Sequence, residues 1–327
     1  MKVSREFLIS ESESSGFRPE MLEKVFHLIG LMNGLNVHPF LKDRLALKGG
    51  TALNLFVFDL PRLSVDIDLN YVGFPDREAM LADRPKIETT VKAVSNREGL
   101  GVRRTASDHA AMTIFIRYQS VLGQGGDLKV DLNFMFRIPI WPIVKMDSLR
   151  MGPFMAKDVP LLDIHELAAG KLTALLARRA SRDLFDGHAL LKKGKLDYSK
   201  LRLAFIVLGA MNRKDWRSVQ ASDLDFSESD LRSELLPLLR KDAYEREDLT
   251  QWAQRLVSET RNTVATLLSF TETEREFLDR LLDHGEIAPW LLTKDEELVD
   301  RIKHHPGLAW KAKNVREFKS LESQRRQ

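Results

Sequence analysis

The chain has 327 residues, of which 43% are hydrophobic and 30% charged. This balance excludes a largely disordered chain, and the length suits two modules at roughly 100 to 200 residues per domain. The sequence contains no cysteine, which excludes disulfides, thiolate zinc sites and a cysteine nucleophile. No run approaches the ~18 apolar residues of a membrane span, and the start lacks a signal-peptide pattern. We therefore expect a cytoplasmic protein with no membrane partner.

Charge is distributed unevenly along the chain, although the net charge is only +3. The segment from Lys171 to Arg217 holds twelve Lys and Arg against four Asp and Glu. Residues 221–300 hold nine against twenty, and residues 301–327 hold eight against two. Such asymmetry predicts a basic face for a polyanion and acidic helices elsewhere.

Hydrophobic periodicity predicts the secondary structure in chain order. Residues 18–33 are expected to form a helix, because apolar side chains recur there at three- and four-residue spacing. Strands are predicted at Leu45 to Leu47, Ser64 to Val72, Met112 to Tyr118 and Leu128 to Phe136, with helices over Thr51 to Phe58 and Arg84 to Glu98. Prolines end this region, and helical periodicity dominates from Asp163 onward.

The pattern predicts an α+β protein with a mixed sheet and a mostly α-helical C-terminal domain. We expect an N-terminal helical brace over residues 1–36, a sheet-containing core over residues 37–158 and a helical domain over residues 159–327.

The segment Lys48-Gly49-Gly50-Thr51 joins a predicted strand to a predicted helix. Glycines let backbone amides approach a ligand, and a helix N-terminus favours phosphate, which Thr51 could also bind unless it only caps the helix. A simple tight turn would use the same residues.

Two carboxylates, Asp66 and Asp68, interrupt the next strand, and a period of two places them on one face with Ser64. Their repulsion favours a bound cation such as Mg²⁺, although an acidic exposed edge strand would look the same. Asp131 interrupts a later apolar strand, and three such carboxylates on adjacent strands could hold two Mg²⁺ ions. Alternatively, Asp131 is an outward surface residue.

Lys171 lies in or beside the apolar stripe of a helix that starts near Asp163 and Glu166, which resemble a capping box. A buried ammonium needs an anionic partner, and a triphosphate would serve, but a lysine that snorkels to solvent is the simpler alternative. In the following helix Ser181 is the expected N-cap, and Asp183 could be only a favourable first-turn charge. No role is assigned to His165 or His188.

In this order the motifs resemble the polymerase-beta-like nucleotidyltransferase superfamily and, more narrowly, the AbiEii/AbiGii nucleotidyltransferase-like toxins with their MenT relatives. The resemblance is carried by Lys48 to Leu53, Arg62 to Leu69, Glu166 to Leu175, Arg182 to Asp186, and His305-Pro306 with Trp310-Lys311. It implies the minimal nucleotidyltransferase sheet with flanking helices. Gly170 departs from the family, in which an acidic residue commonly precedes the lysine, so Glu166 is the nearer acid.

The resemblance also implies residue roles. The implied catalytic residues are Asp66, Asp68, Lys171, Asp183 and Ser64; the implied nucleotide-binding residues are Lys48, Gly49, Gly50, Thr51, Ser64 and Lys171; and the implied metal ligands are Asp66, Asp68 and Asp131. In this hypothesis Lys171 neutralises triphosphate charge, and Asp183 orients Lys171 or a substrate hydroxyl.

The function implied is that of a monomeric toxin from a bacterial toxin–antitoxin pair. It would use an NTP with Mg²⁺ or Mn²⁺ to add nucleotides to the 3′ end of tRNA or another RNA, blocking translation until a cognate antitoxin intervenes. The RNA is expected along the basic residues Arg178, Arg179, Arg182, Lys192, Lys193 and Lys195. The alternatives are nucleotidylation of a protein or small molecule, kinase-like phosphoryl transfer, and a non-catalytic nucleotide- or RNA-binding module.

Overall fold

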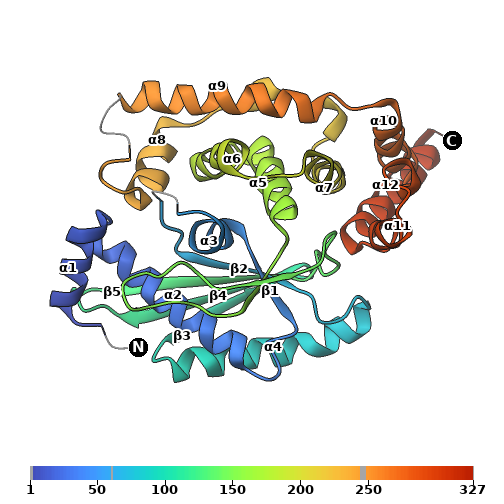
Figure 1. The fold of residues 1–327 in the computed structure, drawn as a ribbon. Helices are drawn as coiled ribbons and strands as arrows, with labels where there is room; N and C mark the ends of the chain where they lie inside the picture. The colour runs from blue at the N-terminus through green and yellow to red at the C-terminus, as the bar shows by residue number, and fades with distance from the viewer. Residues whose placement is uncertain (1–2, 60–61, 244–247, 327) are drawn as a thin grey trace. The chain divides into compact units, whose positions relative to one another are not determined.

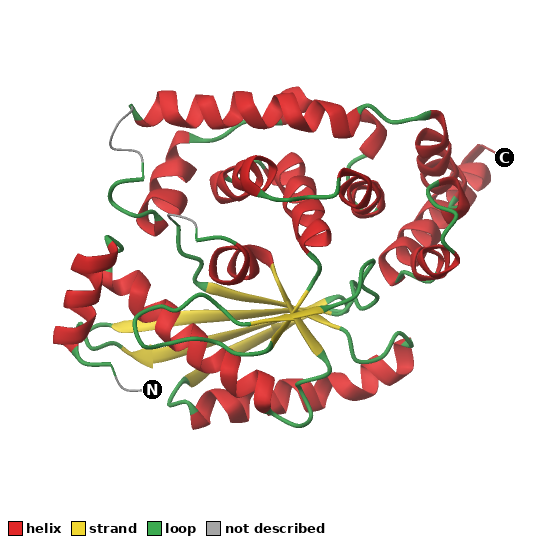
Figure 2. Cartoon of the chain, viewed as in Figure 1, coloured by secondary structure: helices red, strands yellow, loops and turns green. Residues whose placement is uncertain are grey.

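The structure is a computed structural model that describes residues 3–59, 62–243 and 248–326 (Figure 1). The chain divides into two compact units. Unit 1 comprises Met1–Arg137, Pro142–Asp163 and Glu228–Trp252, and unit 2 comprises Ile138–Trp141, Ile164–Ser227 and Ala253–Gln327. Within the described residues every strand belongs to unit 1, whereas unit 2 is helical (Figure 2). The expected α+β class is therefore confirmed.

A single mixed sheet of seven strands, counted over the described residues, forms the centre of unit 1. The strands are β1 (Leu45–Lys48), β2 (Asp66–Tyr71), β3 (Gly101–Ser107), β4 (Ala111–Gln119), β5 (Gly125–Asn133), β6 (Val144–Met146) and β7 (Val159–Leu161). Their order is β3-β4-β5-β2-β1-β7-β6. Strand β2 runs parallel to β5, and β1 runs parallel to β7, while the other neighbours are antiparallel. The predicted strands correspond to β1, β2, β4 and β5.

Helices cover both faces of this sheet (Figure 1). The helices of unit 1 are α1 (Arg5–Ser15), α2 (Pro19–Val37), α3 (Gly49–Ala52) with its π-helical continuation η1 (Leu53–Val57), α4 (Arg77–Arg97), α8 (Glu228–Asp230), η4 (Leu231–Leu235) and η5 (Leu236–Leu238). Helices α2 and α4 lie on one face, and α3 lies on the other. The predicted helix over residues 18–33 is confirmed as α2, whose apolar side chains, among them Phe26 and Ile29, are buried.

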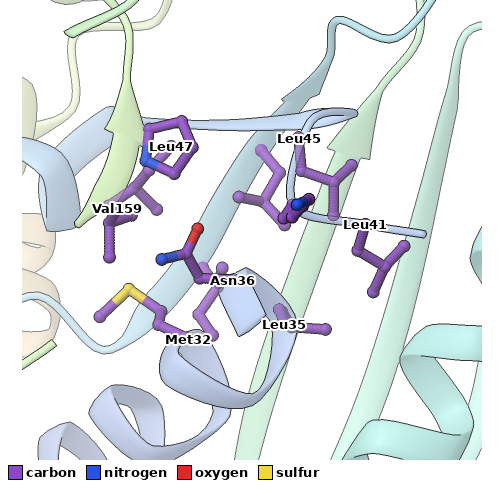
Figure 3. A pocket seen from close by; sticks show the side chains of 11 residues that line it. Met32, Leu35, Asn36, Leu41, Leu45, Leu47 and Val159 are labelled. Carbon is purple, nitrogen blue, oxygen red and sulfur yellow. The ribbon is translucent and has the colours of Figure 1, made fainter. Parts of the chain in front are cut away.

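A small hollow lies between α2 and the sheet (Figure 3). Its lining is mostly apolar and includes Met32 and Leu35 of α2, Leu47 of β1, and Ile67 and Leu69 of β2. Successive side chains of a strand point to opposite faces. The residues that alternate with Ile67 and Leu69 therefore project from the other face of the sheet, away from this hollow.

Unit 2 is built from helices around a core of leucines. Its elements are α5 (Ile164–Arg178), α6 (Ser181–Lys193), α7 (Tyr198–Ala210), η2 (Trp216–Ser218), η3 (Ala221–Asp223), α10 (Glu272–Asp279), η6 (Arg280–His284), η7 (Pro289–Leu291), α11 (Glu296–Lys303) and α12 (Pro306–Arg326). Helix α9 (Leu249–Leu268) runs across the division between the units. The helical C-terminal prediction is confirmed, and no helix among the described residues is long and apolar enough to cross a membrane.

Helix α5 packs against α6 and α7, and its Leu172, Leu175 and Leu176 are fully buried. One expected detail is wrong. Ser181 is the first residue of α6 and not its N-cap, because Ala180 has the extended backbone of a cap residue (φ −78°, ψ 135°).

Candidate functional site

Three carboxylates share one face of the central sheet. Along β2, Asp66 and Asp68 are half-buried and alternate with the buried Ile67 and Leu69. The parallel pairing of β2 with β5 places Asp68 directly beside Asp131. Residues in register on neighbouring strands project to the same side, and the strands are about 4.8 Å apart. We call this set, Asp66, Asp68 and Asp131, the carboxylate face.

Each carboxylate of this face is in register with a lysine or a threonine on a neighbouring strand. Lys48 of β1 is in register with Asp68, and Thr113 of β4 is in register with Asp131. Asp66 is in register with Lys129 of β5. Adjacent carboxylates on a sheet repel each other, so cations placed between them lower the cost of the arrangement.

Both oxygens of the Asp131 carboxylate are engaged within the protein. Lys129 Nζ lies 2.5 Å from Asp131 Oδ2, and Thr113 Oγ1 donates a hydrogen bond of 2.5 Å to Asp131 Oδ1. Partial burial lowers the pKa of Lys129, but the hydrogen bond and charge of Asp131, followed by the charges of Asp66 and Asp68, outweigh burial and raise that pKa. The Lys129 ammonium is thus positioned in the field of all three carboxylates.

The Gly-Gly turn lies against the carboxylate face. Gly49 has a φ of 72°, in the left-handed region, and a Cβ added there would overlap the Asp68 carboxylate. Only glycine lets the chain turn here while Asp68 packs onto it. The turn therefore has a defined structural purpose, which is to make room for Asp68.

Thr51 ties the beginning of α3 to the beginning of β2. Its fully buried hydroxyl donates a 2.5 Å hydrogen bond to the Asp66 carbonyl oxygen and lies 3.0 Å from Ser64 Oγ. Ser64 is also buried, and it precedes β2, which begins at Asp66. These contacts fix the backbone that carries Asp66, so in this structure both hydroxyls support the site from within the protein.

The chemical type of the donor set suits a divalent ion. Asp66, Asp68 and Asp131 offer only carboxylate oxygens, which are the ligands that Mg²⁺ and Mn²⁺ prefer. Across the described residues no three Asp, Glu or His side chains converge as a ready ligand set. The Asp131 carboxylate is held by Lys129 and Thr113.

Unit 2 contains a second charged cluster, formed by Lys171 and Arg178 of α5 with Asp183 and Asp186 of α6, which we call the Lys171 cluster. Lys171 Nζ lies 2.9 Å from an oxygen of Asp183 and 2.9 Å from an oxygen of Asp186. The Asp183 and Asp186 side chains are 1% and 0% exposed, and the Lys171 side chain is 11% exposed. The anionic partners that a buried lysine requires are therefore two carboxylates of the protein.

Arg178 binds Asp183 with two hydrogen bonds, of 2.6 and 3.0 Å. Burial alone would raise the pKa of Asp183, but the charges and hydrogen bonds of Lys171 and Arg178 overcome it and hold that pKa below its ordinary value. Asp183 is thus ionised at neutral pH and fixes the Lys171 ammonium. Roles for Asp186, Thr113 and Lys129 were not predicted from the sequence, in which the only signal for Asp186 is its place in the Arg182 to Asp186 motif.

Nearby polar residues have structural partners. The Glu166 carboxylate accepts a hydrogen bond of 2.9 Å from the Ile140 amide, and His165 Nε2 accepts one of 2.9 Å from the Asp197 amide. His188 Nε2 lies 2.7 Å from the Glu259 carboxylate. These contacts brace the helices of unit 2.

Several cations of the basic segment form ion pairs with carboxylates of the protein. Arg178 pairs with Asp183, Arg179 with Asp223, and Lys192 with Glu259. Lys193 and Lys195 are exposed. Part of the local positive charge is therefore neutralised by carboxylates, and two of them, Asp223 and Glu259, are distant in the sequence.

Comparisons with known proteins find a matching family and a solved structure of similar fold. Residues 30–280 match the family model described as the nucleotidyl transferase AbiEii toxin of type IV toxin–antitoxin systems. A solved structure, MenT4, a nucleotidyltransferase toxin from Mycobacterium tuberculosis H37Rv, is similar in fold, with a TM-score of 0.61 and 18% sequence identity over 92% of this chain and 98% of that one. A comparison with curated proteins finds no match. Because the family model covers most of the sequence, the chain belongs to the AbiEii nucleotidyltransferase toxin family of type IV toxin–antitoxin systems.

Proposed function

We propose that the protein transfers a nucleoside monophosphate from an NTP to the 3′ end of an RNA, with tRNA as the acceptor, and that this modification blocks translation. The observation that carries the proposal is the carboxylate face, in which Asp68 and Asp131 lie in register beside the glycine turn. Membership of the AbiEii family supplies the reaction class, and the site supplies the residues.

In this proposal Asp66 and Asp68 hold Mg²⁺ or Mn²⁺, and Asp131 is the third ligand. When bound, a divalent ion neutralises the negative charge that develops on phosphoryl oxygens. Lys48, Gly49 and Gly50 border the face and are proposed to contact the nucleotide. Thr51 and Ser64 keep their proposed place in nucleotide binding by fixing the backbone at Asp66.

Lys171 and Asp183 are proposed to act in the same reaction, as the family resemblance implies. Asp183 fixes the Lys171 ammonium at 2.9 Å, which restricts the directions in which that charge can act. A positively charged group held in place stabilises developing phosphate charge better than a mobile one, because no reorganisation is needed during the reaction. We assign Asp183 the role of a positioning residue and Lys171 that of a triphosphate ligand.

The RNA acceptor is proposed on grounds of charge. Exposed Lys193 and Lys195 remain available for phosphate contacts, which supply affinity without reading sequence. Partners of the active protein are then an RNA and the cognate antitoxin that the toxin family implies.

The test incubates the purified chain with each NTP, labelled at the α or the γ phosphate, together with total tRNA and Mg²⁺. We expect α label to enter RNA and γ label to be released with pyrophosphate. The matched variant Asp68→Asn keeps the size of the side chain and removes its charge, and we expect its transfer rate to fall by at least about 100-fold.

Other outcomes would point to other functions. Alpha label in protein instead of RNA would contradict the RNA acceptor, and γ label in any acceptor would indicate phosphoryl transfer. A protein that transfers no label yet still stops growth when it carries Asp68→Asn would act by sequestration.

A further inference from the structure

We infer that Lys129 is a resident cation of the carboxylate face, which pairs with Asp131 and competes with a divalent ion for that carboxylate. The inference rests on the proposed metal site and goes beyond it, because it assigns a residue that competes with the metal. It predicts that Lys129 weakens metal binding and does not assist it.

The first support is position. Lys129 and Asp131 are two residues apart on β5, so both project from the same face of the sheet. Across the strand pair Lys129 is in register with Asp66, and Asp131 is in register with Asp68. The ammonium therefore contacts one of the three carboxylates that are proposed to hold the metal and lies in the field of the other two.

The second support is contact. Lys129 Nζ lies 2.5 Å from Asp131 Oδ2, so the ammonium and the carboxylate are in direct contact. Thr113 holds the other oxygen of the same carboxylate. A metal ion that binds Asp131 through Oδ2 competes with the ammonium for that oxygen, because the two cations repel each other at such short separation.

The third support is access. The side chains of Lys129 and Asp131 are 41% and 28% exposed, so an ion from solvent can reach the pair and the lysine can swing away. The four-carbon stem of lysine makes such a movement inexpensive. A released ammonium beside a metal-bound nucleotide would find its next anionic partner in the triphosphate, which couples nucleotide binding to metal binding.

The experiment measures Mn²⁺ binding to the nucleotide-free, full-length chain by isothermal titration calorimetry. Lys129→Met removes the ammonium and keeps the stem, and we expect it to bind Mn²⁺ about tenfold more tightly than the unaltered protein. Lys129→Arg keeps the charge, and we expect its affinity to stay within about threefold of that protein. Without metal, Lys129→Met should melt at a lower temperature, and Mn²⁺ should raise its melting temperature more than it raises that of the unaltered protein.

A second pair of variants separates direct competition from a general effect of charge. In an Asp131→Asn background, Lys129→Met should raise the Mn²⁺ affinity much less, since the contested carboxylate is gone and only the longer-range charge effect on Asp66 and Asp68 remains. Equal or weaker Mn²⁺ binding by Lys129→Met, or an undiminished gain in the Asp131→Asn background, would overturn the role of Lys129. The proposed metal site is tested separately by the double variant Asp66→Asn/Asp68→Asn. If this variant loses Mn²⁺ binding, the metal site stands even where the role of Lys129 is overturned. Absence of Mn²⁺ binding in every variant would overturn both.

Discussion

Replacing Lys171 by methionine tests the Lys171 cluster most directly. The change removes an ammonium that lies 2.9 Å from each of two carboxylates, which are 1% and 0% exposed. Arg178 still neutralises Asp183, so Asp186 is the buried carboxylate that loses a cation at 2.9 Å. Removing one partner of a buried ion pair costs about 3–5 kcal/mol, and we expect the free energy of unfolding at pH 7 to fall by that amount.

The stability that Lys171→Met loses is expected to depend on pH. In the unaltered protein the pKa of Asp183 is lowered, so its stabilising effect is present above the unfolded value of about 3.9 and is lost only as pH falls below it. Without Lys171, a buried carboxylate that has lost this cation favours its protonated form. The cost of Lys171→Met is then smallest at low pH and grows as the pH rises and the carboxylate ionises. Its deficit should therefore be smaller at pH 5 than at pH 7.

Urea unfolding at both pH values, followed by tryptophan fluorescence, measures these differences. Lys193→Met alters an exposed lysine of α6 and serves as the control, with an expected change within about 0.5 kcal/mol. Adding Asp186→Asn to Lys171→Met should restore part of the loss, because it removes a buried negative charge that has lost the Lys171 ammonium. A Lys171→Met protein that unfolds like the control at pH 7, or whose deficit is unchanged at pH 5, would refute the reasoning.

Further predictions concern the glycine turn and the acidic helices. Gly49→Ala should abolish nucleotidyl transfer and lower the melting temperature more than Gly99→Ala does. Both glycines have a positive φ (72° and 77°), but only at Gly49 would an added Cβ overlap a neighbour, Asp68. Equal effects of the two changes would contradict the packing argument. Arg217 binds three carboxylates, of Asp215, Asp279 and Asp283. Arg217→Met should destabilise the protein by about 1 kcal/mol at low ionic strength, and a calorimetric scan in 0.5 M NaCl (about 4 Å screening length) should show a smaller loss, whereas a salt-independent loss would argue for packing instead.

The fold was predictable where hydrophobic side chains alternate. Strands β2, β4 and β5 each bury every second residue, and this is the signal that sequence carries. Strand β3 was missed because most of its residues are exposed, so no apolar alternation marks it. Helix α4 begins at Arg77, earlier than expected, since Asp76 caps it and Pro85 is accommodated inside it.

The candidate site was predictable as a list of residues and not as a set of contacts. A carboxylate in an apolar strand is visible in the sequence, which is how Asp66, Asp68 and Asp131 were found. The register that puts Asp68 beside Asp131 depends on the pairing of β2 with β5, which the local pattern does not specify. For the same reason nothing in the sequence distinguishes Lys129 from an ordinary strand lysine. The sequence also could not tell whether the anionic partner of Lys171 is a triphosphate or the carboxylates of Asp183 and Asp186.

The parallel pairing of β2 with β5 has a consequence for when activity can arise. These strands are far apart in the sequence, since α4, β3 and β4 come between them. Pairings between distant segments form slowly, because the intervening chain must first lose entropy. A nascent or partly folded chain therefore carries Asp66 and Asp68 without their neighbour Asp131. On our proposal, a newly made toxin stays harmless until its sheet has assembled, which leaves an interval in which an antitoxin can act before the first nucleotide is transferred.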